Sequence, residues 1–323
     1  MIIQRMNTMP LPSCAILTDT TTLDGVAPIT HLGVIKIEGD DAAKFIHGQL
    51  TQDFALLDMN TARLAAFCTA KGRMQASFIG FKRSATEILL VCSLDILPAT
   101  LKRLSMFVMR AKAKLSDVSA EYTLFGLVGN ATNLIANEPY SPWAKTDLGS
   151  NTLVNLYPAD GIPRQLWVAP VGTAAPQGQP LSADLWLWSE VRSGVATISA
   201  PVVELFVPQM LNYESIGGVN FKKGCYPGQE IVARSQFRGT LKRRAFVVHA
   251  DASMVAGDEV FAVDDSTQPV ATVVQAAPAP QGGFDAIVSA QLAAVPIGPL
   301  HLGTSEGPAI QISPLPYTLL DDI

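Results

Sequence analysis

The sequence is poor in the residues that build metal sites and disulfide frameworks. Its 323 residues include 4 cysteines and 4 histidines. The cysteines stand at positions 14, 68, 92 and 225, so no two of them form a CxxC pair. Structural zinc sites and disulfide frameworks usually depend on closely spaced cysteines or histidines. We therefore predict no metal site, and free thiols at such irregular spacing suit a reducing compartment.

Long apolar runs and an excess of positive charge are also missing. No run approaches the roughly 18 apolar residues of a membrane span, and the N-terminus lacks the apolar stretch of a signal peptide. We expect a cytoplasmic protein with no direct membrane contact. The net charge of −5 argues against nucleic acid as a direct partner. Apolar residues make up 48% of the chain, which supports large cores and, at this length, two domains.

The first two thirds of the chain alternate between strand and helix periodicity. After an irregular start over residues 1–30, we predict strands at 33–38, 63–68, 74–82, 87–92 and 111–115 and helices at 41–51 and 95–109. This succession is typical of a ferredoxin-like unit. A looser second copy follows, with strands at 122–129, near 153 and near 166, and helices at 130–136 and 182–193.

The last third of the chain consists of short β-rich runs between turns. We predict strands at 245–249, 259–263, 270–275 and 286–289, separated by turns at Asp251, at 257–258 and at 264–265. Such spacing is typical of a small barrel or sandwich. The sequence thus predicts a first domain over residues 1–240 and a second over residues 241–323.

A strand–turn–helix stretch over residues 221–234 contains the most chemically suggestive cysteine. Lys222 and Lys223 precede Cys225, and Pro227 and Glu230 favour the start of a helix at 229–236. Cations and a helix N-terminus lower the pKa of a thiol, so this setting favours a reactive thiolate. A buried cysteine that only fills space is the alternative.

The run Lys223-Gly224-Cys225-Tyr226, followed by Gly228-Gln229-Glu230, resembles the signature of the YgfZ family. The segments 205–212 and 237–244 resemble that family too. The family comprises folate-binding proteins tied to assembly or repair of iron–sulfur clusters, and its fold is similar to the glycine-cleavage T-protein, an aminomethyltransferase. The resemblance implies an α+β fold with two interleaved ferredoxin-like halves, a small C-terminal β-barrel and tetrahydrofolate as cofactor.

Several residues become candidates for the folate site through this resemblance. Lys71 and Arg73 stand in a turn between two strands and could meet the glutamate tail of a folate. A solvated hairpin turn is the alternative reading, and Cys68 beside it is expected to fill the core. Trp186 corresponds to a pocket tryptophan of the family, although plain core packing suits it or Trp188 as well. Around Cys225, the resemblance adds the neighbours Lys223, Tyr226, Gln229 and Glu230.

Arg192 and Leu32 depart from the family pattern. T-protein and many relatives carry an acidic or amide residue in place of Arg192, where it binds the pterin edge. An arginine accepts no hydrogen bonds, so another acceptor is needed, and Glu204 is one option. Leu32 stands near the position of a further pocket tryptophan. His47, in the first predicted helix, is expected to be a partly exposed polar residue.

The resemblance favours a folate-binding accessory protein that supports iron–sulfur enzymes, and through them possibly tRNA modification. Iron–sulfur proteins or cluster carriers are then its partners, and Cys225 is its functional thiol, facing or flanking the folate cavity. A folate-dependent one-carbon transferase is the second hypothesis, but residues 74–81 contain no Asp or Glu to serve as its acid or base. A non-catalytic interaction module is the third. An enzyme is therefore the less favoured reading.

Overall fold

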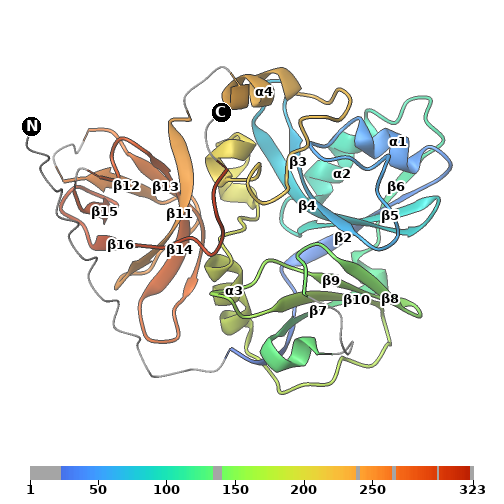
Figure 1. The fold of residues 1–323 in the computed structure, drawn as a ribbon, viewed down its shortest axis with the longest axis horizontal. Helices are drawn as coiled ribbons and strands as arrows, with labels where there is room; N and C mark the ends of the chain where they lie inside the picture. Colours follow the sequence, from blue (N-terminus) through green and yellow to red (C-terminus); the bar gives the residue numbers. More distant parts are fainter. Residues whose placement is uncertain (1–22, 134–139, 238–240, 264–266, 297, 321–323) are drawn as a thin grey trace, which may run out of the picture.

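A computed structural model describes residues 23–133, 140–237, 241–263, 267–296 and 298–320. Two stacked sheets stand beside a barrel, with helix α3 between them (Figure 1). Parts of four predictions lie outside the described residues: the irregular start up to residue 22, the second half of the helix at 130–136, the turn at 264–265, and residues 238–240 of the segment that follows the cysteine motif.

The first sheet has the strand order β3-β4-β5-β2-β6, and every neighbouring pair is antiparallel. The order β6-β2-β5-β4 is that of a ferredoxin-like unit, and β3 extends it by one strand beyond that pattern. The helix predicted at 41–51 is shorter, and the strand predicted at 111–115 begins later. The elements are β2 (Leu32–Glu38), α1 (Ala42–His47), β3 (Ala62–Cys68), β4 (Met74–Ser84), β5 (Glu87–Ser93), α2 (Leu97–Ser105) and β6 (Lys114–Asp117).

Strand β5 shows why the first sheet is buried on both faces. Ile88, Leu90 and Cys92 pack in the core that includes residues of α1 and α2. Leu89 and Val91, which point to the other face, pack in the core shared with the second sheet. A strand covered on both faces reads as a continuous apolar run, which is the pattern of residues 88–92.

The second sheet has the order β1-β7-β10-β9-β8. Its first strand comes from residues 25–28, so the prediction of an irregular chain up to residue 30 is wrong there. Because β1 precedes the whole first sheet in the chain, the two halves are interleaved. A short 3-10 helix stands where a helix was predicted from residue 130. The elements are β1 (Gly25–Pro28), η1 (Ser119–Glu121), β7 (Tyr122–Val128), η2 (Gly129–Thr132), β8 (Lys145–Leu148), β9 (Asn151–Asn155) and β10 (Arg164–Pro170).

Helix α3 (Ala183–Arg192) joins the sheets to the barrel. Ser182 caps it, accepting a hydrogen bond from the amide of Leu185. Trp186 is buried between the sheets, whereas Trp188 is half-buried and donates from its indole to Asp285 of the barrel over 2.7 Å. These two tryptophans, two residues apart on the helix, therefore face different sides.

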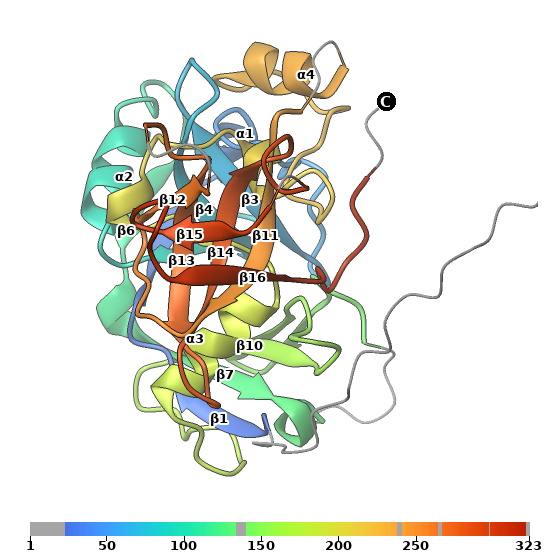
Figure 2. The same cartoon turned by 90° about the vertical axis from the view of Figure 1, so that its left-hand side faces the viewer.

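The barrel closes through the order β11-β14-β13-β12-β15-β16, seen from its side in Figure 2. It begins at Arg243, beside the predicted domain boundary. Two strands at its end, β15 and β16, were not predicted. After β16 the chain returns to the first domain, where the Tyr317 hydroxyl donates to the carbonyl of Gly194 over 2.8 Å. The strands are β11 (Arg243–Ala250), β12 (Glu259–Ala262), β13 (Ala271–Pro278), β14 (Phe284–Gln291), β15 (Leu300–Leu302) and β16 (Ala309–Ser313).

Between α3 and the barrel, the chain forms η3 (Ala200–Val202), η4 (Pro208–Leu211) and helix α4 (Gln229–Phe237). Helix α4 lies at the edge of the first sheet, above β3 and β4 in Figure 1. It matches the helix predicted at 229–236. None of the helices in the described ranges is long and apolar enough to cross a membrane.

Candidate functional site

Residues 220–228, which we call the Cys loop, present Cys225 to solvent just ahead of helix α4. Pro227 lies in the turn before the helix rather than at its first position. Gly228 has a φ of +81°, a conformation that favours glycine, whereas Gly224 is not among the glycines with positive φ. Because Cys225 is exposed, the space-filling alternative does not describe it. Cys68 and Cys92 are buried, and burial raises the pKa of both thiols to about 12.

Lys223 anchors the Cys loop to the end of helix α1. Its ammonium donates to the carbonyls of His47 (2.6 Å), Leu50 (2.9 Å) and Gly224 (3.3 Å) and lies 4.5 Å from the centre of the Tyr226 ring. Desolvation lowers the pKa of Lys223 to about 8. Burial also raises the pKa of the Tyr226 hydroxyl. These two candidate residues thus hold the loop in place, and Lys222 is the exposed cation beside the thiol.

The β3–β4 turn packs directly on the Cys loop. A Cβ on Gly228 would lie 2.4 Å from the carbonyl oxygen of Thr69 and 2.7 Å from the Cα of Gly72. This close approach brings Lys71 and Arg73 to the same end of the molecule as Cys225. Lys71 is exposed, and the Arg73 guanidinium donates to the carbonyl of Leu205. Gln229 and Glu230 begin α4 beside this turn, and Glu230 is exposed.

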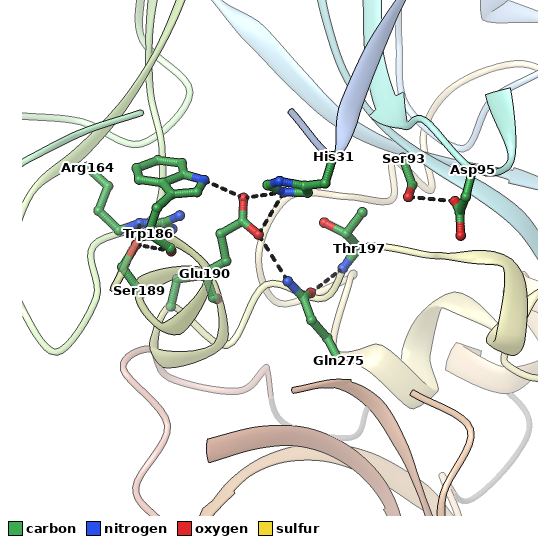
Figure 3. A network of polar contacts seen from close by, with 10 residues as sticks. His31, Ser93, Asp95, Arg164, Trp186, Ser189, Glu190, Thr197 and Gln275 are labelled. Atoms are coloured by element: carbon green, nitrogen blue, oxygen red, sulfur yellow. Dashed lines mark hydrogen bonds and ion pairs between the residues drawn. The ribbon is translucent and has the colours of Figure 1, made fainter. Parts of the chain in front are cut away.

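A second polar cluster centres on Glu190 of helix α3 (Figure 3). Its carboxylate accepts hydrogen bonds from the indole of Trp186 (2.9 Å) and the amide of Gln275 (3.2 Å), and contacts Nε2 of His31 at 3.1 Å. The three partners come from α3, strand β13 and the chain just before β2. The Arg164 guanidinium lies 4.5 Å from the centre of the Trp186 ring.

The Glu190 carboxylate stays ionised despite its burial. Burial raises its pKa, but His31, Arg164 and the Trp186 indole outweigh that effect, so the pKa lies below the usual value. For His31, burial lowers the pKa, and the neighbouring carboxylate more than offsets it, so the pKa is raised. An ion pair therefore stands at the meeting point of both sheets and the barrel.

Two cavities adjoin this ion pair. The larger, about 650 Å³, lies between the first sheet, α3 and the barrel, and His31, Asp95 and Gln275 supply polar groups to its otherwise largely apolar wall. The smaller, about 50 Å³, is lined by Trp186, Glu190 and Leu32 among others. Thr197 lines both. Trp186 and Glu190 thus line the smaller cavity, and His31 and Gln275, which both contact the Glu190 carboxylate, line the larger one.

The remaining predicted residues lie elsewhere. Arg192 binds Asp160 through two hydrogen bonds of 2.7 and 2.9 Å and pairs with Asp285 of the barrel at 3.5 Å, so it joins domains. Glu204 is exposed and accepts a hydrogen bond from Gln75. Neither lines the two cavities, and the described residues that do line them include none from the Cys loop.

A buried carboxylate, Glu190, stands two residues before Arg192 and accepts a hydrogen bond from Trp186, whereas Glu204 lines neither cavity. The sequence held a signal for it, because Glu190 lies four residues after Trp186 on the predicted helix and shares its face. His31 and Gln275 had no such signal, since only the folded chain brings them to α3.

The chain has an aminomethyltransferase-like fold. The glycine cleavage system aminomethyltransferase T from Bartonella henselae superposes with a TM-score of 0.67 at 14% identity, covering 91% of this chain and 86% of that one. This confirms the predicted fold class.

Two curated relatives identify the family. The chain is 32% identical over 250 residues to the tRNA-modifying protein YgfZ of Colwellia psychrerythraea, covering 74% of this chain and 75% of the relative. It is 32% identical over 304 residues to that of Edwardsiella ictaluri, covering 88% and 89%. No family model matches. The chain belongs to the YgfZ family.

Proposed function

We propose that the protein binds tetrahydrofolate and acts as an accessory factor for iron–sulfur enzymes, through which it affects tRNA modification. The observation that carries the folate part is the buried Glu190 carboxylate beside a cavity of about 650 Å³. That volume lies in the range of small-molecule sites. A pterin is flat and apolar on its faces, and one edge presents N–H donors that a carboxylate accepts.

The residues present fit such a ligand. Leu187, Met254 and Phe284 offer apolar walls to the larger cavity. Glu190, which lines the smaller cavity and lies behind His31 and Gln275, offers the acceptor. Its oxygens are already engaged by His31 and Gln275, so pterin donors would replace those contacts. No Lys or Arg occurs among the described residues that line the larger cavity. The anionic tail of a folate would therefore extend away from it. Trp186 supports the site by orienting Glu190.

The accessory role rests on Cys225. An exposed thiol attacks disulfides, holds soft metals transiently or is oxidised, and each of these is useful to a protein that serves iron–sulfur enzymes. Lys222 precedes it in the Cys loop, and Lys71 and Arg73 belong to the turn that packs on this loop. The relatives are named tRNA-modifying proteins, which supports the link to tRNA. The cytoplasmic location remains part of this proposal.

Calorimetric titration of tetrahydrofolate into the full-length protein tests the folate part. We expect micromolar binding that Glu190→Gln weakens by about tenfold or more, because hydrogen bonds to charged groups contribute about 1.5–3 kcal/mol. Glu204→Gln is the matched control, since this exposed carboxylate lines neither cavity, and it should bind like the wild type. Absence of binding at millimolar ligand, or equal binding by Glu190→Gln, would overturn the proposal.

A demethylation assay on the same samples tests the transferase alternative through released formaldehyde.

A further inference from the structure

The imidazole of His47 lies directly against the Cys loop. His47 is the last residue of α1 and is partly exposed, as predicted. Its Nε2 lies 3.4 Å from the position that a Cβ on Gly224 would take, and the next residue is Cys225. One ring nitrogen of a histidine therefore faces the loop that presents the exposed thiol.

The opposite ring nitrogen of His47 is held by a carboxylate. Nδ1 lies 3.1 Å from Oδ1 of Asp53, whereas the amide of Ala55 is farther, at 3.4 Å. The carboxylate contact is shorter and charge-assisted, so we assign the proton to Nδ1. The lone pair of a neutral ring is then on Nε2, toward the Cys loop. Burial raises the pKa of Asp53, but hydrogen bonds from the backbone amide of Leu56 and from His47 outweigh it and keep this carboxylate ionised.

The other charges around the ring are cationic. The Lys223 ammonium donates to the carbonyl of His47 itself, and Lys44 is exposed one turn earlier on α1. Lys222, also exposed, adds positive charge on the loop side. A thiolate beside an imidazolium is the arrangement that activates cysteine nucleophiles.

We propose that His47, oriented by Asp53, accepts the proton of the Cys225 thiol and stabilises the thiolate. In this step the S–H bond of Cys225 breaks and an N–H bond forms at Nε2, with no further reactant. His47 acts here as a general base for the functional thiol, and Asp53 is the residue that positions its ring. The inference rests on the proposed role of Cys225, and its test requires neither folate nor a partner protein.

The test is the pH dependence of alkylation of the full-length protein by iodoacetamide, in a Cys14→Ser background and read by intact mass. We expect His47→Gln, which preserves the size of the side chain, to raise the apparent pKa of Cys225 by about one unit and to slow alkylation at neutral pH about tenfold. Asp53→Asn should shift the profile in the same direction by less. His249→Gln is the matched control, because His249 forms a similar pair with Asp285, with Nδ1 and Oδ1 2.8 Å apart, on the barrel.

The two buried thiols report whether each variant is folded during the alkylation experiment. Cys68 and Cys92 react only if the protein unfolds, so a second and third alkylation would reveal an unfolded variant. If His47→Gln unfolds, Asp53→Asn carries the test. A wild-type profile in a folded His47→Gln protein, or the same shift in His249→Gln, would refute the role of His47. Failure of folate binding would leave this result unaffected.

Discussion

Replacing Gly228 by alanine tests whether the contact between the β3–β4 turn and the Cys loop is built into the backbone. The added Cβ would meet the carbonyl oxygen of Thr69 at 2.4 Å and the Cα and N of Gly72 at 2.7 and 2.8 Å. All three are backbone atoms, so no side chain can rotate away. Either the turn that carries Lys71 and Arg73 moves, or the start of α4 does.

Two effects add up in Gly228→Ala. The positive φ of +81° costs an alanine about 1–2 kcal/mol. Forcing a methyl group into packed backbone costs about 1–3 kcal/mol more. Gly161→Ala separates the two, since Gly161 has a φ of +83° and nothing within 4 Å of its added Cβ. The control should therefore lose only the first contribution.

Urea unfolding followed by circular dichroism measures both variants. We expect Gly228→Ala to lower the free energy of unfolding by about 1–3 kcal/mol more than Gly161→Ala does. Alkylation of Cys225 should also change rate only in Gly228→Ala, because only that substitution displaces the Cys loop. Equal losses of stability in the two variants, with equal alkylation rates, would show that the close packing is not what holds the turn on the loop.

Two further predictions concern the same end of the molecule. Cys225→Ala should change the free energy of unfolding by less than about 0.5 kcal/mol, because the thiol is exposed, yet abolish support of iron–sulfur enzymes. Cys68→Ala, in the core, should lower the free energy of unfolding by about 1 kcal/mol. A loss of stability at Cys225 equal to that at Cys68 would contradict a functional role for the Cys225 thiol. Lys223 has a folded pKa of about 8, below the ordinary 10.5, so the unfolded chain binds more protons between these values and stability should rise with pH across this window. Lys223→Met should lack that rise in pH-dependent urea titrations, and an unchanged slope would refute the assignment.

The sequence predicted the elements whose burial is decided locally. The strand at 87–92 and the helix at 182–193 each carry their periodicity within one element, so both could be predicted. Strand β1 was missed because four residues carry little periodicity, and its pairing partner β7 lies about a hundred residues away. The small strands β15 and β16 were missed for the same reason. The barrel, not their own pattern, makes them strands.

The site residues likewise fall into those predictable from local sequence and those that depend on contacts between distant segments. Cys225, Gly228 and the turn at Lys71 were predicted from local chemistry and from the family signature. The carboxylate of Glu190 was missed because its contacts with His31 and Gln275 form only in the folded chain. Those two residues come from opposite ends of the chain. Arg192, which stands where relatives carry a pterin-binding residue, holds the barrel to the second sheet through Asp285 and Asp160.

The Cys loop and the two cavities near Glu190 share none of the described residues, so any coupling between them must pass through other segments. One route exists through segment 196–206. Thr197 lines both cavities, the amide of Ile198 donates to the Ser77 hydroxyl on β4, and the amide of Met74, next to the β3–β4 turn, donates to Phe206. These contacts show one well-packed arrangement and no second one.

Coupling between sites requires an element with two states, so we expect saturating tetrahydrofolate to change the alkylation rate of Cys225 by less than about twofold. A larger change would reveal a second arrangement of this segment. Ile198 and Ser77 are then the contact to test, because Ser77→Ala removes the hydrogen bond without touching either site.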